Sequence, residues 1–262
     1  MSNTIISHLN MQIELDNAGA TIISGNGEVI RVNCDGKLLP QRVIDKVNFD
    51  FMGRTEQRIA KEWYLNRKQK GINEDKENNR REFFDILDAA VSKVNKEYYI
   101  ANVEASIDKN GRIYYKDGEK VAVGLTGEAW KIKATEFAPE YGSDLASNYQ
   151  YVLWIAYRIA KGFWTVEYVC DDSSSQGNYF NAPGSSHKLE TSGARTVGGA
   201  RNGVGNTCKV VTSANGFCWF GGWYSFDGSD CPVGCYTDVR DPKFGVLGFG
   251  SGVLVLNRVR GI

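Results

Sequence analysis

The feature that most constrains the fold is a change of composition near residue 172. Seventeen of the 29 glycines fall in the last ninety residues, which contain three lysines and one glutamate. Charged side chains and helical patterns dominate the earlier residues. Short apolar runs between glycine-rich turns are typical of a β domain. The sequence therefore predicts an α+β protein with a mixed helical and short-strand domain over residues 1–172 and a Gly-rich all-β domain over residues 173–262.

Before residue 172 the chain alternates between strand-like runs and helical patterns. Weak alternation over residues 11–40, with turn signals at 25–27 and 34–36, predicts short strands. The pattern becomes helical over residues 41–69. An apolar stripe with i, i+3, i+4 and i+7 spacing predicts an amphipathic helix, and it consists of Phe83, Phe84, Leu87, Val91, Val94 and Tyr98. We expect this stripe to be buried internally or against sister subunits.

Turn and cap residues place the remaining elements of the first half. The Asn-Gly pair within residues 108–112 predicts a β-hairpin. Thr126 is placed to cap a short helix, and either Ser143 or Asp144 is placed to cap a longer one. The run TVEYVC, at residues 165–170, is typical of a strand.

The second half contains an aromatic and glycine-rich stretch, CWFGGWYSFDGSDCPVGC, at residues 218–235. We predict strands at residues 208–212, 216–226, 234–239 and 252–259. Along a strand over 216–226, Trp219 and Trp223 would share one face and Phe220 and Tyr224 the other. Aromatic residues on both faces indicate core packing on both sides, or core on one side and a partner on the other. The glycines between them leave room for a neighbouring element, which favours core packing.

Four of the six cysteines lie close in sequence: Cys208, Cys218, Cys231 and Cys235. Zinc sites commonly combine two close pairs of ligands, and only Cys231 and Cys235 have such spacing. Disulfides require an oxidising compartment. We therefore interpret these residues as buried free thiols that fill a tight sheet, with zinc ligation and disulfides as alternatives. We predict no metal site and no cofactor.

Catalytic motifs are not recognisable in this sequence. Only two histidines occur, and His187 is the one placed to partner a nucleophile. Asp171, Asp172 and Glu190 lie near the junction of the two halves and could serve a hydrolase with a cleft between them. We interpret Asp171 and Asp172, like the pair Glu136 and Glu140, as surface or capping residues. We predict no catalytic residue, with the hydrolase as the alternative function.

The totals exclude several classes of protein. Net formal charge is zero, which argues against bulk electrostatic binding to nucleic acid or to an anionic membrane. No run approaches 18 consecutive apolar residues, so we expect no membrane span. The first residues contain no basic region followed by an apolar stretch, so we expect no signal peptide.

Three segments carry a resemblance to a known class of proteins. The runs SSSQGNYFNAPGSS, GGARNGVGN and GFGSGVLVLNRVRGI resemble the C-terminal regions of tailed-bacteriophage virion structural proteins, such as fibres and decoration proteins. The Gly- and Trp-rich composition of the last ninety residues also resembles that of the C-type-lectin-like display domains of phage receptor binders. The resemblance implies self-association, with a trimer favoured, and binding to the particle or to a host surface.

We therefore predict a non-enzymatic virion protein, made in the host cytoplasm, that binds the particle through its first half. The second half would bind a host surface glycan, a host protein or a neighbouring virion protein. Loops 171–187 and 195–206 would carry specificity, because loops on a rigid scaffold tolerate variation. The alternatives are the hydrolase and a phage-encoded protein that targets a host component. The predicted binding residues are Trp219, Trp223, Tyr224, Tyr236, Asn202 and Arg201.

Overall fold

The computed structural model confirms the predicted α+β class. It describes backbone and side chains over residues 49–71, 80–116, 118–192, 205–237 and 250–257. It describes the backbone alone over residues 4–8, 11–16, 19–23, 29–33, 78–79, 196–197, 200–201 and 238–239. Arg201 therefore has a described backbone only, and Asn202 lies outside the described residues.

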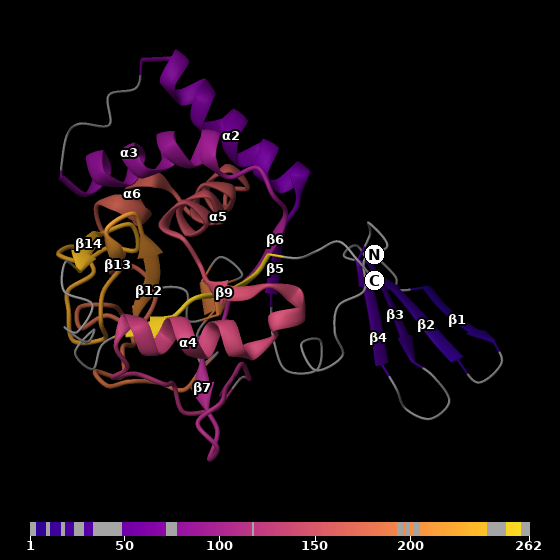
Figure 1. Ribbon diagram of the computed structural model, residues 1–262. Helices are drawn as coiled ribbons and strands as arrows, with labels where there is room; N and C mark the ends of the chain where they lie inside the picture. Colours follow the sequence, from indigo (N-terminus) through magenta and orange to yellow (C-terminus); the bar gives the residue numbers. More distant parts are fainter. Residues whose placement is uncertain are drawn as a thin grey trace.

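An antiparallel meander begins the described chain. It consists of β1 (Thr4–His8), β2 (Met11–Asp16), β3 (Gly19–Ile23) and β4 (Val29–Asn33) in sequential order, and is drawn in indigo on the right of Figure 1. The predicted strands between residues 11 and 33 are thus confirmed. The remaining predictions between residues 34 and 48 lie outside the described residues.

Two four-stranded sheets form the centre of the molecule. The first has the order β5 (Phe49–Met52), β6 (Tyr98–Ala101), β16 (Leu254–Leu256), β9 (Ser143–Leu145), all antiparallel. The second has the order β14 (Tyr236–Val239), β13 (Gly216–Phe220), β12 (Cys208–Ser213), β15 (Gly250–Gly252), with β12 and β15 parallel. Short hairpins join β7 (Ser106–Ile107) to β8 (Ile113–Tyr114) and β10 (Thr196–Val197) to β11 (Ala200–Arg201).

The last described strand joins the two halves of the chain. Val255, on β16, lies opposite Ile100 of β6 on one side and Asp144 of β9 on the other. Residues after the compositional change near residue 172 therefore complete a sheet that begins before it. The two halves share this sheet and the core around it.

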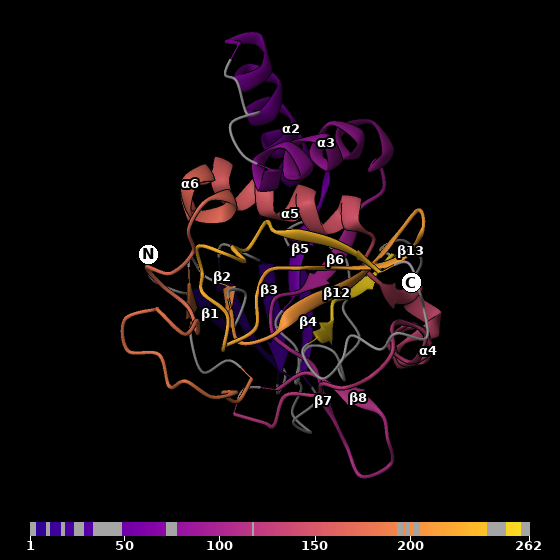
Figure 2. The ribbon, with the colours of Figure 1, turned by 90° about the vertical axis from the view of Figure 1, so that its left-hand side faces the viewer.

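Helices cover both sides of the sheets (Figure 1). In Figures 1 and 2, α2 (Arg54–Gln69) and α3 (Asn78–Lys93) lie above α5 (Asn148–Ala160), which lies above the sheets. The short α6 (Val166–Cys170) follows α5. On the other side lie α4 (Gly127–Phe137) and the 3-10 turn η1 (Pro139–Tyr141). This arrangement gives two apolar clusters, one on each side of the sheets.

The larger cluster is centred on α5, whose residues are buried around most of the helix. Tyr151 packs against Phe220 of β13, with ring centroids 5.1 Å apart. Asp50 of β5 accepts a hydrogen bond from Trp154 Nε1 at 2.6 Å and forms an ion pair with Arg158. These contacts fix α5 on both sheets, because a helix that is apolar all round is stable only when other elements cover it.

Several local predictions are confirmed. The helix with the apolar stripe is α3, where Phe83, Phe84 and Leu87 are buried against the core. The helix ends at Lys93, and Tyr98, the last member of the predicted stripe, lies on β6. The Asn-Gly hairpin is β7–β8, and Gly111 adopts the left-handed φ of +76° that this turn requires. Thr126 caps α4 by accepting a hydrogen bond from Ala129 N.

Three local predictions are wrong. Residues 166–170 form α6 rather than a strand, because the Thr165 side chain caps the helix by accepting a hydrogen bond from Tyr168 N. Residues 143–145 form strand β9, and α5 is capped by Ser147 instead. Residues 49–52, inside the predicted helix over 41–69, form β5. In each case the local sequence is compatible with both a helix and a strand, and a side-chain cap or a neighbouring strand determines which of the two forms.

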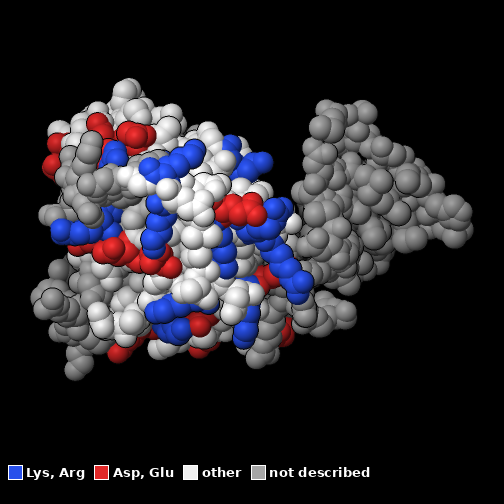
Figure 3. Space-filling model, turned by 90° about the horizontal axis from the view of Figure 1, so that it is seen from above, with Lys and Arg blue, Asp and Glu red and all other residues white. Residues whose placement is uncertain are grey.

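No helix in the described part of the chain is long and apolar enough to cross a membrane. Figure 3 shows Lys and Arg side chains interspersed with Asp and Glu on the face around α2 and α3. That face therefore carries no field of a single sign, in keeping with the net charge of zero.

Candidate binding site

Two loops meet on the side of the second sheet, and we call them loop A (residues 171–192) and loop B (residues 221–235). Loop A follows α6 and runs down one side of the molecule (Figure 2, salmon to orange). Phe180 N in loop A donates to Phe226 O in loop B at 3.1 Å, and Gly228 N donates to the Asn181 side chain at 3.0 Å. A Cβ on Gly228 would lie 2.5 Å from Ser174 N. The glycine thus allows an approach that no larger residue permits.

An aromatic surface lies where these loops meet, and we define it as Phe180, His187, Tyr224 and Phe226. Phe180 is 55% exposed and Phe226 is 37% exposed. The His187 ring packs edge-on against Phe180 with centroids 5.1 Å apart. Tyr224 packs on Trp223 with centroids 4.5 Å apart. Large exposed apolar rings on two loops that are joined by backbone hydrogen bonds indicate a binding surface.

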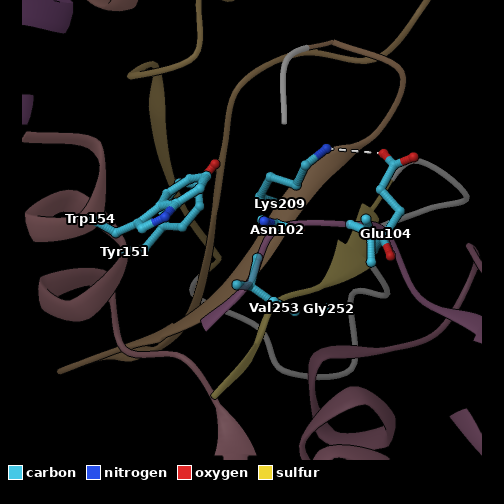
Figure 4. Close-up of a pocket in the computed structure, with 10 residues that line it drawn as sticks. Asn102, Glu104, Tyr151, Trp154, Lys209, Gly252 and Val253 are labelled. Atoms are coloured by element: carbon cyan, nitrogen blue, oxygen red, sulfur yellow. Dashed lines mark hydrogen bonds and ion pairs between the residues drawn. The ribbon is translucent and has the colours of Figure 1, made fainter. Parts of the chain in front are cut away.

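A buried carboxylate, that of Glu104, forms an ion pair with Lys209 of β12 (Figure 4). Glu104, which follows β6, is 2% exposed. Its carboxylate accepts from Lys209 Nζ at 3.0 Å and from Asn206 Nδ2 at 2.6 Å, and it also accepts from the Thr207 hydroxyl. Lys209 Nζ donates further to Thr207 O at 2.8 Å. The charged groups are therefore paired and hydrogen-bonded, as buried charges must be.

Two asparagines extend this network into loop A. Asn178 Nδ2 donates to Asn206 Oδ1 at 2.9 Å and to Lys188 O at 2.9 Å. Asn206 Oδ1 also accepts from Glu190 N at 2.8 Å. Asn206 adopts a left-handed φ of +60°, which asparagine tolerates better than most residues. We call Glu104, Asn178, Asn206, Thr207 and Lys209 the anchoring network, because it joins loop A to β6 and β12.

The cavity beside Glu104 and Lys209 is too small for an organic ligand. Its volume is about 20 Å³, and Tyr151, Trp154 and Asn102 lie around it. A space of this size holds about one water molecule. This centre therefore organises the loops rather than receiving a substrate.

A larger groove lies on another face, between the β7–β8 hairpin and α4. Its volume is about 610 Å³, and its lining includes Arg112, Tyr114, Lys133 and Phe137. Lys133 Nζ donates to Gly111 O across it. The groove is open and mixes both signs of charge, so its shape and chemistry select no class of ligand.

The structure separates the predicted binding residues into two groups. Tyr224 belongs to the aromatic surface, and Trp223 supports it from a position only 9% exposed. Trp219, on β13, packs against the smaller apolar cluster. Tyr236, on β14, packs against Phe220 with ring centroids 5.4 Å apart. Trp219 and Tyr236 are therefore half-buried residues of the second sheet, and they pack against the apolar clusters rather than against the aromatic surface.

The predicted strand over residues 216–226 ends at Phe220, so the prediction that it continues is wrong. Gly221 adopts a left-handed φ of +71°, which turns the chain out of the sheet. A Cβ on Gly222 would lie 2.8 Å from Tyr179 Cε1 and 2.9 Å from Cys231 O. These glycines therefore mark a turn packed tightly on loop A, and Trp219 and Trp223 do not share the face of one strand.

The carboxylates considered for a hydrolase have structural partners. Asp171 forms a two-point ion pair with Arg80 of α3. Asp172 Oδ1 accepts from Ser174 N at 2.7 Å in a local turn. His187, with a left-handed φ of +52°, packs against Phe180. Among the described residues, no group of three or more His, Cys, Asp or Glu side chains could hold a metal ion.

Sequence reasoning missed Phe180 and the anchoring network. Phe180 lies in the polar run SSSQGNYFNAPGSS beside Tyr179, and this run has too few apolar residues to predict a strand or helix. An aromatic pair in an otherwise polar loop is the signal that could have identified it. Glu104 and Lys209 are 105 positions apart, and no local pattern connects them.

Comparisons with known proteins give no further guide. No protein-family model, no curated protein and no solved structure matches this chain.

Proposed function

We propose that this chain is a non-enzymatic binding protein that captures a surface glycan on the aromatic surface formed by loops A and B. One observation carries the proposal: Phe180 and Phe226 are both exposed, on two loops that a hydrogen bond between their backbones joins and that are otherwise fastened to the scaffold. Exposing these rings to water is unfavourable unless a partner covers them. Fastened loops also bind at a smaller entropic cost than mobile ones.

The size and surroundings of the aromatic surface favour a glycan over a protein. A stable protein interface buries about 800 Å² on each partner, and four side chains supply only part of such an area. Polar groups of Asn181 and Ser186 lie in the same loop as Phe180. A sugar has an apolar face that stacks on aromatic rings, and hydroxyl groups that need hydrogen-bond partners. Aromatic side chains beside amide and hydroxyl groups therefore suit a sugar ligand.

Substitution of Phe180 tests this proposal. Immobilised glycans, including bacterial surface polysaccharides, would be probed with the wild-type protein, with Phe180→Ala and with Ile132→Ala. Ile132 is 56% exposed on α4 and is thus a matched control. We expect Phe180→Ala to weaken binding about 30-fold, the effect of a hot-spot residue that contributes about 2 kcal/mol. Equal binding by Phe180→Ala and wild type would contradict the proposal, and so would binding only to a protein partner.

We propose that this binding protein is displayed on a phage particle, with the first half toward the particle and loops A and B outward. The three C-terminal runs that resemble virion proteins support this setting. Light scattering coupled to size-exclusion chromatography measures whether the chain self-associates. We expect a closed trimer, and a monomer of 29.1 kDa at micromolar concentration would contradict the virion setting.

A further inference from the structure

Two cysteines lie side by side in loop B. Cys231 and Cys235 are four positions apart, and their thiols are hydrogen-bonded to each other. The backbone fixes this arrangement: Cys231 N donates to Asp227 O at 3.0 Å, and Cys235 N donates to Pro232 O at 2.9 Å. Both side chains are half-buried, so small molecules can reach the pair. The spacing that suggested a metal pair thus creates two adjacent thiols.

The two thiols are chemically unequal. The hydrogen bond with Cys235 lowers the pKa of Cys231 to about 7, which favours its thiolate relative to that of an ordinary cysteine. The same hydrogen bond, together with burial, raises the pKa of Cys235. Asp230 opposes the thiolate of Cys231 by charge repulsion, but less strongly than the hydrogen bond favours it. Cys208, nearby on β12, is buried, and burial raises its pKa to about 12.

We propose that Cys231 and Cys235 form a reversible thiol–disulfide pair, with Cys231 as the attacking thiol and Cys235 as the resolving thiol. The Cys231 thiolate attacks one sulfur of a low-molecular-weight disulfide, such as oxidised glutathione, and releases one thiolate. Cys235 then loses its proton to solvent and attacks Cys231 Sγ, which releases the second small thiol. The protein loses two hydrogens, and one small disulfide is reduced to two thiols.

This pair contacts the first residues of loop B, the loop that also carries Tyr224 and Phe226. Gly222 packs against Cys231, and Gly221 N donates to Cys235 O at 3.0 Å. Closing the disulfide cross-links the end of loop B and restricts the residues that pack on it. The pair would then regulate the aromatic surface, and this consequence rests on the proposed function, whereas the thiol chemistry does not.

Mass spectrometry of the folded full chain treated with oxidised glutathione tests the pair. In the wild type we expect loss of two hydrogens, no lasting adduct, and a Cys231–Cys235 cross-link in the peptide map. In Cys235→Ala we expect a stable glutathione adduct on Cys231. In Cys231→Ala we expect slow reaction, because the thiol with the lowered pKa is gone. Cys208→Ala is the control, and it should close the disulfide as the wild type does.

A second measurement separates a special thiol pair from ordinary exposed cysteines. We expect the rate at which iodoacetamide alkylates Cys231 to rise with pH around a midpoint near 7, and the midpoint to move upward in Cys235→Ala. A lasting adduct on wild-type Cys231, or the same midpoint in both proteins, would overturn the proposal, and so would a metal ion held by the untreated pair in native mass spectra.

Hydrogen exchange at Gly221 reports the effect on loop B. We expect its amide to exchange at least several-fold more slowly in the disulfide form than in the reduced form, because the cross-link holds Cys235 O in place. Equal exchange would overturn the link to the aromatic surface. Loss of glycan binding with intact disulfide closure would instead count against the proposed function alone.

Discussion

Glu104 and Lys209 form an ion pair that solvent barely reaches, and their surroundings explain why it is retained. Each charge also has neutral partners: Asn206 Nδ2 donates to Glu104, and Lys209 donates to Thr207 O. A buried ion pair stabilises a fold little more than two apolar residues of similar volume would. Loss of one partner, however, leaves an uncompensated buried charge and is strongly destabilising. The pair therefore serves to hold loop A in one position.

Lys209→Met tests the pair at the scale of the residue. It leaves the Glu104 carboxylate buried without its cation, and we expect it to lower the free energy of unfolding by about 3 kcal/mol or more. Denaturant unfolding measures this change. Arg58→Met is the control, because Arg58 pairs with Glu62 on the exposed face of α2 and such pairs contribute little. Equal effects of the two substitutions would show that Lys209 does not anchor the loop.

Helix α5 is the element on which the two sheets and α2 and α3 pack, so its start determines the register of the core. Ser147 Oγ accepts from Gln150 N at 3.2 Å, and Gln150 Oε1 accepts from Ser147 N at 3.0 Å. This reciprocal capping box satisfies two backbone donors that a helix leaves unpaired at its first turn.

Ser147→Ala should lower the free energy of unfolding by about 1 kcal/mol, the usual effect of removing an N-cap side chain. Thermal unfolding followed by circular dichroism measures the shift. Ser92→Ala, in the exposed last turn of α3, removes a hydroxyl of the same size and should leave the transition almost unchanged. If the transition of Ser147→Ala also stays in place, the capping box does not stabilise α5.

Elements with strong local signals could be predicted from the sequence. The spacing of Phe83, Phe84 and Leu87 predicted α3, and the Asn-Gly pair predicted the β7–β8 hairpin. The run TVEYVC has the β-branched and aromatic residues of a strand, but the Thr165 cap makes it a helix. One hydrogen bond from a cap is enough to favour a helix over a strand in such a short segment. The preference for a strand also depends on neighbouring strands, which the local sequence does not reveal.

The candidate site was predicted in part. Loop A overlaps the predicted specificity loop at residues 171–187. Tyr224 was named as a binding residue, but on a strand over residues 216–226 rather than in a loop. Phe180 and the anchoring network did not follow, since they depend on contacts between residues far apart in the chain. Glycines at 221 and 222 were interpreted as part of a strand, whereas the left-handed φ at Gly221 ends it.

At the scale of the whole molecule, the two compositional halves are interleaved. Strand β16 lies between β6 and β9, and β15 pairs with β12. The residues that complete the first sheet therefore come last in the chain. Such long-range pairing makes the described sheets depend on residues at the end of the chain.

Truncation after residue 249 tests this dependence. It removes β15 and β16, and leaves β6 and β9 without the strand between them. We expect the truncated chain to lose cooperative thermal unfolding and to be digested rapidly by trypsin. A truncated chain that still unfolds cooperatively, with α2, α3 and α5 protected from the protease, would show that residues 1–249 contain a self-sufficient fold.

Hydrogen exchange of loop A is the measurement that tests most directly whether a rigid scaffold holds the binding loops. It compares the wild type with Glu104→Gln, which keeps the shape of the side chain and removes its charge. We predict slow exchange in the wild type of the Ser192 and Glu190 amides of loop A and of the Asn206 amide, which donates to Asn178 O in that loop; each of the three donates a hydrogen bond. In Glu104→Gln these amides should exchange at least tenfold faster, while the Tyr151 amide of α5 keeps its rate. Fast exchange of loop A in the wild type, or the same rates in both proteins, would contradict the account.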